Sequence, residues 1–317
     1  MQIQYPIQLN ERIHLIDGFD LGVAERTGTY VIVEEELTIV DTGPSPSVKH
    51  VIKGLEALGF SLDLVKYIIV THIHLDHAGG TGLLLEKCPN ATVVVHPRGA
   101  RHLANPERLV AGAKAVYGKT FTEYIGAVSP IPKDRLLVKD EGDTLNIGPT
   151  CTLKFLDTPG HAKHHFSIYD PISNGMFTGD TVGIRYEQLI RDGVDLFVPS
   201  TSPNQFDVDA MQEAIDRMVK MDLDYIYYGH FGMTNNPKKA LQQVAEWITV
   251  FTNEAERVAN EQKEHEVLSK RLLSRIREYL RELGVADNHE VYFLIELDMQ
   301  ISAMGLMDYI TQINAKR

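Results

Sequence analysis

Apolar residues in the first two thirds of the chain follow two alternating periods, one typical of strands and the other of helices. Runs rich in β-branched and aromatic residues predict strands at 13–16, 29–33, 37–41, 67–71, 92–96, 144–147, 151–157, 166–170, 175–180 and 224–230. Apolar residues three or four positions apart predict helices at about 46–58, 81–87 and 207–221. This alternation predicts an α/β fold.

Two regions depart from the alternation. In 97–128, apolar residues at helical spacing predict one or two helices between the strand-rich halves. From Pro237 onward the pattern predicts three helices, the second of which ends at Gly284. We therefore expect a main domain at 1–236 with a helical insertion at about 97–128. Residues 237–317 are expected to form a C-terminal helical extension that packs on the core or forms a dimer interface.

Composition and charge narrow the class of protein. The 317-residue chain carries a net charge of −12, which disfavours a nucleic-acid backbone as partner. Its two cysteines, Cys88 and Cys151, show no CxxC spacing, which fits a reducing compartment. The first residues lack the layout of a signal peptide, and no apolar run approaches the roughly 20 residues of a membrane span. We expect a cytoplasmic, soluble protein that binds neither nucleic acid nor membrane.

Metal-ligand side chains crowd together after one predicted strand. The stretch THIHLDH places His72, His74, Asp76 and His77 directly after the apolar run 67–70. Imidazole and carboxylate groups are the usual ligands of divalent zinc, manganese or iron. His72 and His74 share a side if the chain stays extended, because side chains alternate. Asp76 and His77 can then serve a second metal ion after the chain bends.

Two metal ions require further ligands, and the rest of the chain supplies them in a similar context. His161, Asp180 and His230 each stand at or just after the end of a predicted strand. Active sites often collect where strands give way to loops, because strands hold the loop residues still. The four strand-end clusters together predict a metal site.

The ordered motifs HxHxDH, TPGH, TGD and GH resemble those of the metallo-β-lactamase-fold hydrolases over about residues 10–236. The resemblance implies a four-layer αββα sandwich with metals at one edge of its two sheets, here with extra C-terminal helices. It also implies seven ligands for two metal ions: His72, His74 and His161 for one ion, Asp76, His77 and His230 for the other, and Asp180 as the bridge.

For several other residues the sequence allows both a functional and a structural role. The resemblance implies that Asp41, in the turn VDTG, supports the metal site from behind its ligands, although it could instead stabilise its own turn. His164 and His165 could orient a ligand, or they could begin the next strand with one side chain inward and one outward. Packing is the favoured role for Tyr186, ahead of contact with a substrate oxygen. His96 is expected to be an ordinary surface residue.

The predicted ligand set indicates hydrolysis. Two metal ions about 3.5–4 Å apart can share a water and lower its pKa from about 15.7 toward neutrality. The resulting bridging hydroxide is expected to cleave an ester, thioester or lactone of a small molecule. The resemblance implies a catalytic role for Asp76, as a ligand and as a proton shuttle to the leaving group. Zinc is the favoured metal, and iron or manganese accept the same donors.

Alternative functions remain open at this point. A phosphodiesterase of the same fold would use the same metals on a different substrate. A di-iron oxidoreductase related to the flavodiiron proteins would typically carry glutamate where this chain has His74. A purely structural metal site is disfavoured because the motif contains no cysteine. The apolar stretch 291–310 makes a homodimer a further expectation.

Overall fold

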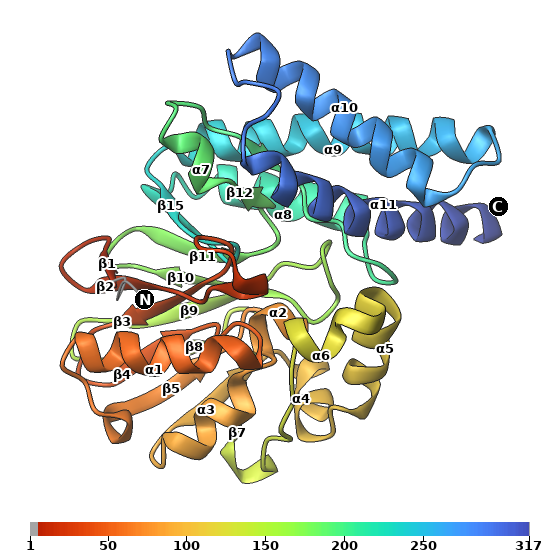
Figure 1. The fold of residues 1–317 in the computed structure, drawn as a ribbon. Helices are drawn as coiled ribbons and strands as arrows, with labels where there is room; N and C mark the ends of the chain where they lie inside the picture. The colour runs from red at the N-terminus through yellow and green to blue at the C-terminus, as the bar shows by residue number, and fades with distance from the viewer. Residues whose placement is uncertain (1–5, 317) are drawn as a thin grey trace. The chain divides into compact units, whose positions relative to one another are not determined.

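The computed structural model describes residues 6–316, which form two compact units (Figure 1). Unit 1 comprises Met1–Thr158, His164–Gly179 and Leu223–Asn236, and unit 2 comprises Pro159–Lys163, Asp180–Asp222 and Pro237–Arg317. The units therefore interleave along the chain. The predicted division into residues 1–236 and 237–317 stays a prediction.

Unit 1 contains a seven-stranded sheet whose strands follow one another in sequence order. They are β1 (Ile7–Gln8), β2 (Ile13–Asp17), β3 (Gly28–Ile32), β4 (Leu37–Val40), β5 (Val65–Ile69), β6 (Thr92–Val95) and β7 (Leu136–Val138). Neighbouring strands from β1 to β4 run antiparallel, and those from β4 to β7 run parallel. The parallel half leaves β5 and β6 ending at the same edge, where loops can carry ligands.

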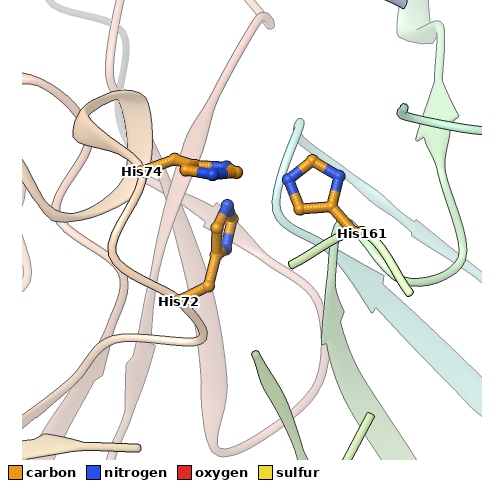
Figure 2. A group of neighbouring side chains, drawn as sticks. All are labelled: His72, His74 and His161. Atoms are coloured by element: carbon orange, nitrogen blue, oxygen red, sulfur yellow. The ribbon is translucent and has the colours of Figure 1, made fainter. Parts of the chain in front are cut away.

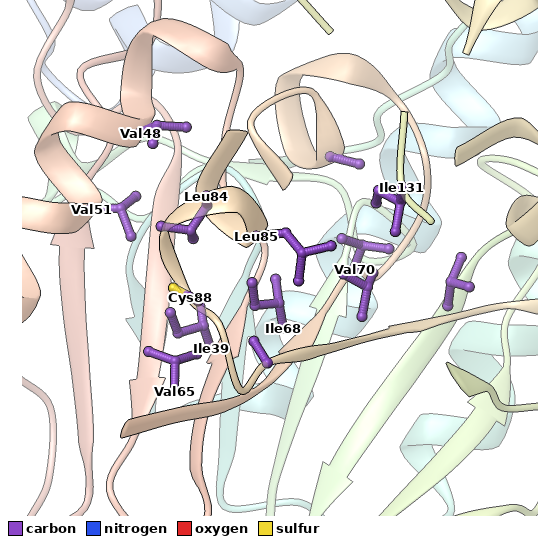
Figure 3. Packing of buried hydrophobic residues seen from close by; sticks show 14 of the residues in the cluster. Ile39, Val48, Val51, Val65, Ile68, Val70, Leu84, Leu85, Cys88 and Ile131 are labelled. Carbon is purple, nitrogen blue, oxygen red and sulfur yellow. The ribbon is translucent and has the colours of Figure 1, made fainter. Parts of the chain in front are cut away.

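Two helices link the parallel strands and pack on the sheet. Helix α1 (Val48–Ala57) lies between β4 and β5 in the sequence, and α3 (Thr81–Lys87) lies between β5 and β6. Val51, Leu84 and Ile68 are fully buried in the cluster that joins these helices to the strands (Figure 3). Each such side chain stabilises the fold by about 1.5–3 kcal/mol when it is removed from water. This packing fixes the strand ends that precede the histidine motif.

The second sheet of unit 1 has six strands in the order β15-β14-β11-β10-β9-β8. They are β8 (Thr144–Asn146), β9 (Thr152–Asp157), β10 (Phe166–Asp170), β11 (Gly175–Gly179), β14 (Tyr225–Tyr228) and β15 (Met233–Thr234). Only β11 and β14 pair in parallel, so this sheet is mixed.

The two sheets share an apolar core built mainly from strand side chains. Tyr30 and Ile69 of the first sheet pack with Phe155, Phe177 and Tyr227 of the second. The rings of Tyr30 and Phe177 meet edge to face with centroids 5.2 Å apart. Because strand side chains alternate, Ile69 points into this core while its neighbour on β5 packs under the helices.

The predicted insertion in unit 1 is helical. It forms α4 (Pro97–Ala104), α5 (Glu107–Tyr117) and α6 (Phe121–Tyr124). Phe121 and Ile125 are buried against Leu75 of the short helix α2 (Leu75–Ala78). Since α2 lies within the histidine motif, the insertion packs directly on the segment that carries the candidate ligands.

Unit 2 is mainly helical. Its elements are the ribbon β12 (Ile184–Arg185) and β13 (Phe197–Val198), with α7 (Glu187–Ile190), α8 (Val208–Val219), α9 (Pro237–Asn260), α10 (His265–Glu282) and α11 (Val291–Lys316). Helices α9, α10 and α11 pack on one another (Figure 1). As predicted, Pro237 begins a helix and Gly284, with φ of 84°, follows the end of another.

Helix α11 contains the whole apolar stretch 291–310. Leu294, Ile295 and Met299 are buried within the chain itself. The homodimer that this stretch suggested therefore stays a prediction. No helix within residues 6–316 combines the length and the apolar composition needed to cross a membrane.

Candidate metal centre

The histidine motif begins where β5 leaves the sheet. Val70 still donates its N–H to Val94, and Thr71 accepts a hydrogen bond from the N–H of Phe166 on β10. The backbone bends at Thr71 and His72, and His74, in an extended conformation, is the N-cap residue of α2. The side chains of His72 and His74 still lie together, although the chain is not extended as the prediction assumed, and their rings meet edge to face with centroids 4.6 Å apart (Figure 2).

The turn of α2 brings Asp76 and His77 into a second group with His230, which follows β14. Asp76 Oδ2 lies 3.6 Å from His77 Nε2 and 3.8 Å from His230 Nε2. One ligand atom from each of the three residues lies within 4.8 Å of the others. Both distances to Asp76 are longer than a hydrogen bond of about 2.7–3.2 Å. Tetrahedral ligands at about 2.1 Å from zinc lie roughly 3.4 Å apart, so the group fits a divalent ion.

Asp41 supports this group from behind. Its carboxylate Oδ2 lies 3.1 Å from His77 Nδ1, and both side chains are buried. With Nδ1–H donating to the carboxylate, the Nε2 lone pair of His77 is left to face Asp76. Asp41 reaches this position in a left-handed conformation, with φ of 55°. The supporting role that the resemblance implied therefore fits the geometry.

Thr71 extends the same support to His72. The Thr71 hydroxyl donates to Asp41 Oδ2 over 2.8 Å and lies 3.1 Å from His72 Nδ1. Because that hydroxyl proton goes to the carboxylate, the hydroxyl oxygen accepts from His72 Nδ1–H. The Thr71 N–H also donates to Asp41 Oδ1 over 2.8 Å. One carboxylate thus sets the ring orientation of His77 directly and of His72 through a hydroxyl.

Unit 2 holds the other two predicted ligands. His161, also drawn in Figure 2, donates from Nδ1 to the backbone oxygen of Ser200 over 2.9 Å. Asp180 Oδ2 accepts from the Ser200 hydroxyl over 2.9 Å and lies 3.6 Å from His161 Nε2. Both ligand-type side chains are buried. Their separation again exceeds a hydrogen bond and matches the spacing of two ligands on one ion.

The seven predicted ligands thus form local groups inside each unit. Unit 1 gathers His72 with His74, and Asp76 with His77 and His230. Unit 2 gathers His161 with Asp180. The division of the seven residues between two particular metal ions stays a prediction.

The residues left open in the sequence now have defined surroundings. His164 and His165 are both buried, which contradicts the alternative with one side chain outward. The His165 ring centroid lies 5.1 Å from that of His72, and its Nδ1 lies 3.0 Å from the Thr158 hydroxyl. Residue 165 is therefore part of the packing around the first histidine of the motif.

The surroundings of His96 in unit 1 and of Tyr186 in unit 2 bear on the roles expected for them. The expectation of a surface position for His96 is wrong, because the ring is 3% exposed and its Nε2 lies 3.1 Å from Asp157 Oδ1. His96 Nδ1 accepts from the N–H of Arg98, so Nε2–H donates to the carboxylate. In unit 2 the Tyr186 hydroxyl donates to Asp298 over 2.9 Å, which agrees with the packing role.

Sequence reasoning missed three residues around the ligands. Thr71 could have been noticed, since it directly precedes His72. Ser200 gives no such signal, because 39 residues separate it from His161. Asp20 is buried beside Arg26, and burial raises its pKa to about 6. The charges of Asp76 and His230 also act on Asp20, so this acid lies within electrostatic range of the candidate site.

Comparison with known proteins identifies the family. A model of the metallo-beta-lactamase superfamily matches residues 25–230. The metallo-beta-lactamase fold-containing protein ST1585 of Sulfurisphaera tokodaii is 26% identical over 228 residues, or 70% of this chain and 79% of that protein. Its crystal structure matches with a TM-score of 0.67 at 20% identity and covers 94% of this chain and 98% of that one.

Two relatives with named activities match shorter segments. A hydroxyacylglutathione hydrolase of Idiomarina loihiensis is 30% identical over 171 residues, which cover 54% of this chain and 51% of that protein. The N-acyl homoserine lactonase AttM of Rhizobium radiobacter is 31% identical over 120 residues, which cover 38% of this chain and 41% of the lactonase. The chain thus spans about half or less of these two proteins. The predicted metallo-β-lactamase fold with extra C-terminal helices is confirmed, and its two sheets are mixed. Since the family model spans well over half of the chain, the chain belongs to the metallo-β-lactamase superfamily.

Proposed function

We propose that the chain is a dinuclear metal-dependent hydrolase that cleaves an ester, thioester or lactone of a small molecule. The observation that carries the proposal is the convergence of Asp76 Oδ2 on the Nε2 atoms of His77 and His230, at 3.6 and 3.8 Å. Asp41 holds His77 in the tautomer that a metal requires. This arrangement, with His77 and His230 buried and Asp76 partly exposed, supports the proposal that the group holds a cation.

The proposed ligand set is the full seven residues. His72, His74 and His161 would hold one ion, Asp76, His77 and His230 the other, and Asp180 would bridge them. Chain connectivity supports the contribution of unit 2. Pro159–Lys163 is joined at both ends to unit 1, and Asp180 directly follows the last residue of β11. His161 is three residues from Thr158 and from His164, a reach of at most about 11 Å.

The chemistry follows from this donor set. Two bound divalent ions would supply a water acidified toward neutral pH and a Lewis acid for the substrate oxygen. Asp76 would hold one ion and pass a proton to the leaving group. Nitrogen and carboxylate donors without cysteine favour zinc, and iron or manganese remain compatible with them.

Three observations support a small-molecule ester, thioester or lactone as the substrate. Two relatives are named for hydrolysis of hydroxyacylglutathione and of an N-acyl homoserine lactone. The net charge of −12 disfavours a polynucleotide as the substrate. Helices α5 and α6 pack on Leu75, next to two of the proposed ligands, so this insertion is suited to shape one side of a small-molecule site.

The test combines metal content with hydrolysis of a substrate panel. We expect about two zinc, manganese or iron ions per chain by elemental analysis, as for two-metal hydrolases. His74→Ala should lose much of this metal, while His102→Ala, a partly exposed histidine on α4, should retain it. Asp76→Asn should lower kcat/KM for an ester, thioester or lactone by at least about 100-fold, through lost proton transfer and weakened metal binding.

Other outcomes would contradict the proposal. A chain that holds no metal and takes up none on reconstitution cannot work in this way. Hydrolysis confined to phosphodiesters would favour the phosphodiesterase alternative. Two irons with visible absorption and no hydrolysis of the panel would favour an oxidoreductase.

A further inference from the structure

Ser200 contacts both proposed ligands of unit 2. Its backbone oxygen accepts from His161 Nδ1–H, and its hydroxyl donates to Asp180 Oδ2, each over 2.9 Å. Ser200 is buried with them, at 8% exposure. The first contact fixes the His161 tautomer with Nε2 as the ligand atom, and the second fixes the rotation of the carboxylate. The position of one residue thus sets the orientation of two ligands.

The segment around Ser200 has little regular structure of its own. It follows β13, which is only two residues long and pairs with β12 through Ile184 and Val198. Gly183, in the turn after Asp180, has φ of 71°, and an added Cβ there would lie 2.0 Å from the Val198 oxygen. This short ribbon therefore ties the turn after Asp180 to the segment on one side.

Helix α11 ties the segment on the other side. The buried Thr201 hydroxyl donates to the backbone oxygen of Ser302 over 2.9 Å. Three residues further along α11, an added Cβ on Gly305 would lie 2.2 Å from the Thr201 oxygen. Glycine lets the helix backbone approach the residue next to Ser200 more closely than any side chain would allow.

A third contact lies on the same face of α11. Asp298 accepts from the Tyr186 hydroxyl over 2.9 Å, and both side chains are buried. Asp298, Ser302 and Gly305 are four and three residues apart, so they form one stripe along the helix. The stripe therefore contacts Tyr186, which directly follows β12, and Thr201, which directly follows Ser200.

We infer that this stripe of α11 is a positioning element for the metal ligands of unit 2. The stripe fixes the position of Thr201, and the peptide bond to Thr201 fixes the position of Ser200. Ser200 in turn orients His161 and Asp180 through its two hydrogen bonds. Ser200 and Gly305 are positioning residues, because neither contacts a reacting atom. The inference rests on the proposed function, since it assigns a role toward two proposed metal ligands. Helix α11 would then position metal ligands as well as stabilise its own unit.

The test measures zinc affinity and folding on the same samples. Gly305→Ala should displace Thr201 and Ser200, and Ser200→Ala should release the Asp180 carboxylate. Both should weaken zinc binding about 10–100-fold, the usual effect of changing the partners of metal ligands. Competition with a chromophoric chelator measures the affinity, and far-UV circular dichroism checks that each variant is folded.

The matched control is Gly112→Ala on α5. There an added Cβ meets nothing within 4 Å among the residues that the structure describes. This variant should bind zinc like the unmodified chain and should be slightly more stable, because alanine favours a helix over glycine by up to about 1 kcal/mol. If Gly305→Ala fails to fold, Thr201→Val replaces it, since it removes only the hydroxyl bond to Ser302.

The outcomes separate the inference from the proposed function. If the unmodified chain binds about two zinc ions and Gly305→Ala or Thr201→Val lowers the affinity, the positioning role holds. If these variants lower the unfolding temperature but keep the zinc affinity and stoichiometry, α11 acts in packing alone and the inference is wrong. If the unmodified chain binds no zinc, iron or manganese, the proposed function fails first and the inference fails with it.

Discussion

Unit 1 contains two buried polar clusters at the two ends of one strand, β10. The ligand cluster consists of His72, His74, Asp76, His77 and His230, with Asp41 and Thr71 behind them. The Arg12 cluster consists of Arg12, Glu34, Cys151 and Asp170. Phe166 at the start of β10 donates its N–H to Thr71, and Asp170 ends the strand. The two clusters therefore lie roughly 13 Å apart along the strand.

In the Arg12 cluster, the positive charge of the guanidinium is paired directly with carboxylates. The Arg12 guanidinium donates to Glu34, to Asp170 over 3.0 Å and to the Cys151 sulfur over 3.1 Å. Burial alone would lower the pKa of Arg12, but the carboxylates of Asp170 and Glu34 outweigh it, so the pKa is raised. Burial, reinforced by Asp170, raises the pKa of the Cys151 thiol to about 12. Every member of this cluster has a partner of matching type at bonding distance.

The ligand cluster is buried to a similar extent but is arranged differently. Asp76 faces the Nε2 atoms of His77 and His230 at 3.6 and 3.8 Å, and the hydrogen bond from His77 Nδ1 to Asp41 lies on the opposite side of the His77 ring. These separations suit atoms around a shared cation. The two clusters therefore differ in how their donors converge. In the ligand cluster one carboxylate faces two imidazole Nε2 atoms at separations longer than a hydrogen bond, whereas in the Arg12 cluster the side chains bond to one another directly.

The largest effect is expected from breaking the Arg12 cluster. Arg12→Met leaves the buried Asp170 and the partly buried Glu34 without their cation, so the free energy of unfolding should fall by about 3–5 kcal/mol. Urea unfolding measures the loss. Metal content should stay unchanged, because the cluster lies at the other end of β10.

The matched control is an exposed ion pair. Lys238 and Asp222 lie 3.4 Å apart with side chains 80% and 83% exposed, so Lys238→Met should cost less than about 1 kcal/mol. An equal loss in both variants would show that the Arg12 cluster contributes no more than a surface pair. A loss of metal from Arg12→Met would show that the two clusters are coupled.

A smaller effect is expected from changing the support of the ligand cluster. Asp41→Asn keeps the shape, and asparagine tolerates the φ of 55° at this position. Asparagine has one acceptor oxygen in place of two, so it cannot serve the Thr71 N–H and His77 Nδ1–H as Asp41 does. With the amide nitrogen facing His77, the ring would carry its proton on Nε2 and lose its ligand atom. Zinc affinity should fall about 10–100-fold in a chelator competition, or about 1.4–2.7 kcal/mol.

The control for this variant changes a histidine–aspartate contact with no proposed role in metal binding. His96 Nε2 lies 3.1 Å from Asp157 Oδ1, as His77 Nδ1 does from Asp41. Asp157→Asn should therefore leave zinc affinity unchanged. Equal affinities for Asp41→Asn and the unmodified chain would contradict the support assigned to Asp41.

The sequence predicted most regular elements because their periodicity is local. The helix at 81–87 and the strand at 166–170 have the predicted bounds, and each is encoded by its own residues. Strand β5 ends at Ile69 although 67–71 was expected. The Thr71 N–H leaves the strand pattern because it donates to Asp41 Oδ1, 30 residues away. Tertiary contact with the ligand cluster thus accompanies the earlier end of the strand, which begins at Val65 and keeps the predicted length of five residues.

The site was predictable where its residues form a motif and hidden where they depend on the fold. His72, His74, Asp76 and His77 stand together in the sequence, so their chemistry could be inferred directly. Ser200 acts on two residues that lie 39 and 20 positions away. The two-residue strands β12 and β13, which hold its segment, were also missed, because only their pairing defines them.

The smallest effect is expected from Asp17, which belongs to neither cluster and should change only how the free energy of unfolding depends on pH. It is a buried carboxylate that accepts hydrogen bonds from the N–H groups of Phe19 and Glu25. Burial raises its pKa from 3.8 to about 6. The folded chain therefore binds a proton that the unfolded chain has released, so stability should fall as the pH rises through this range.

Asp17→Asn should remove this pH dependence. Between pH 5 and pH 8 the free energy of unfolding of the unmodified chain should fall by about 1 kcal/mol relative to the variant, since one pKa unit corresponds to about 1.4 kcal/mol. Urea titrations of metal-free protein at both pH values measure the difference, with the exposed Asp222→Asn as control. The amide also changes the hydrogen bond to Glu25, but that cost does not vary with pH. Only the slope is therefore diagnostic, and parallel curves for the two chains would show that Asp17 titrates like an exposed carboxylate.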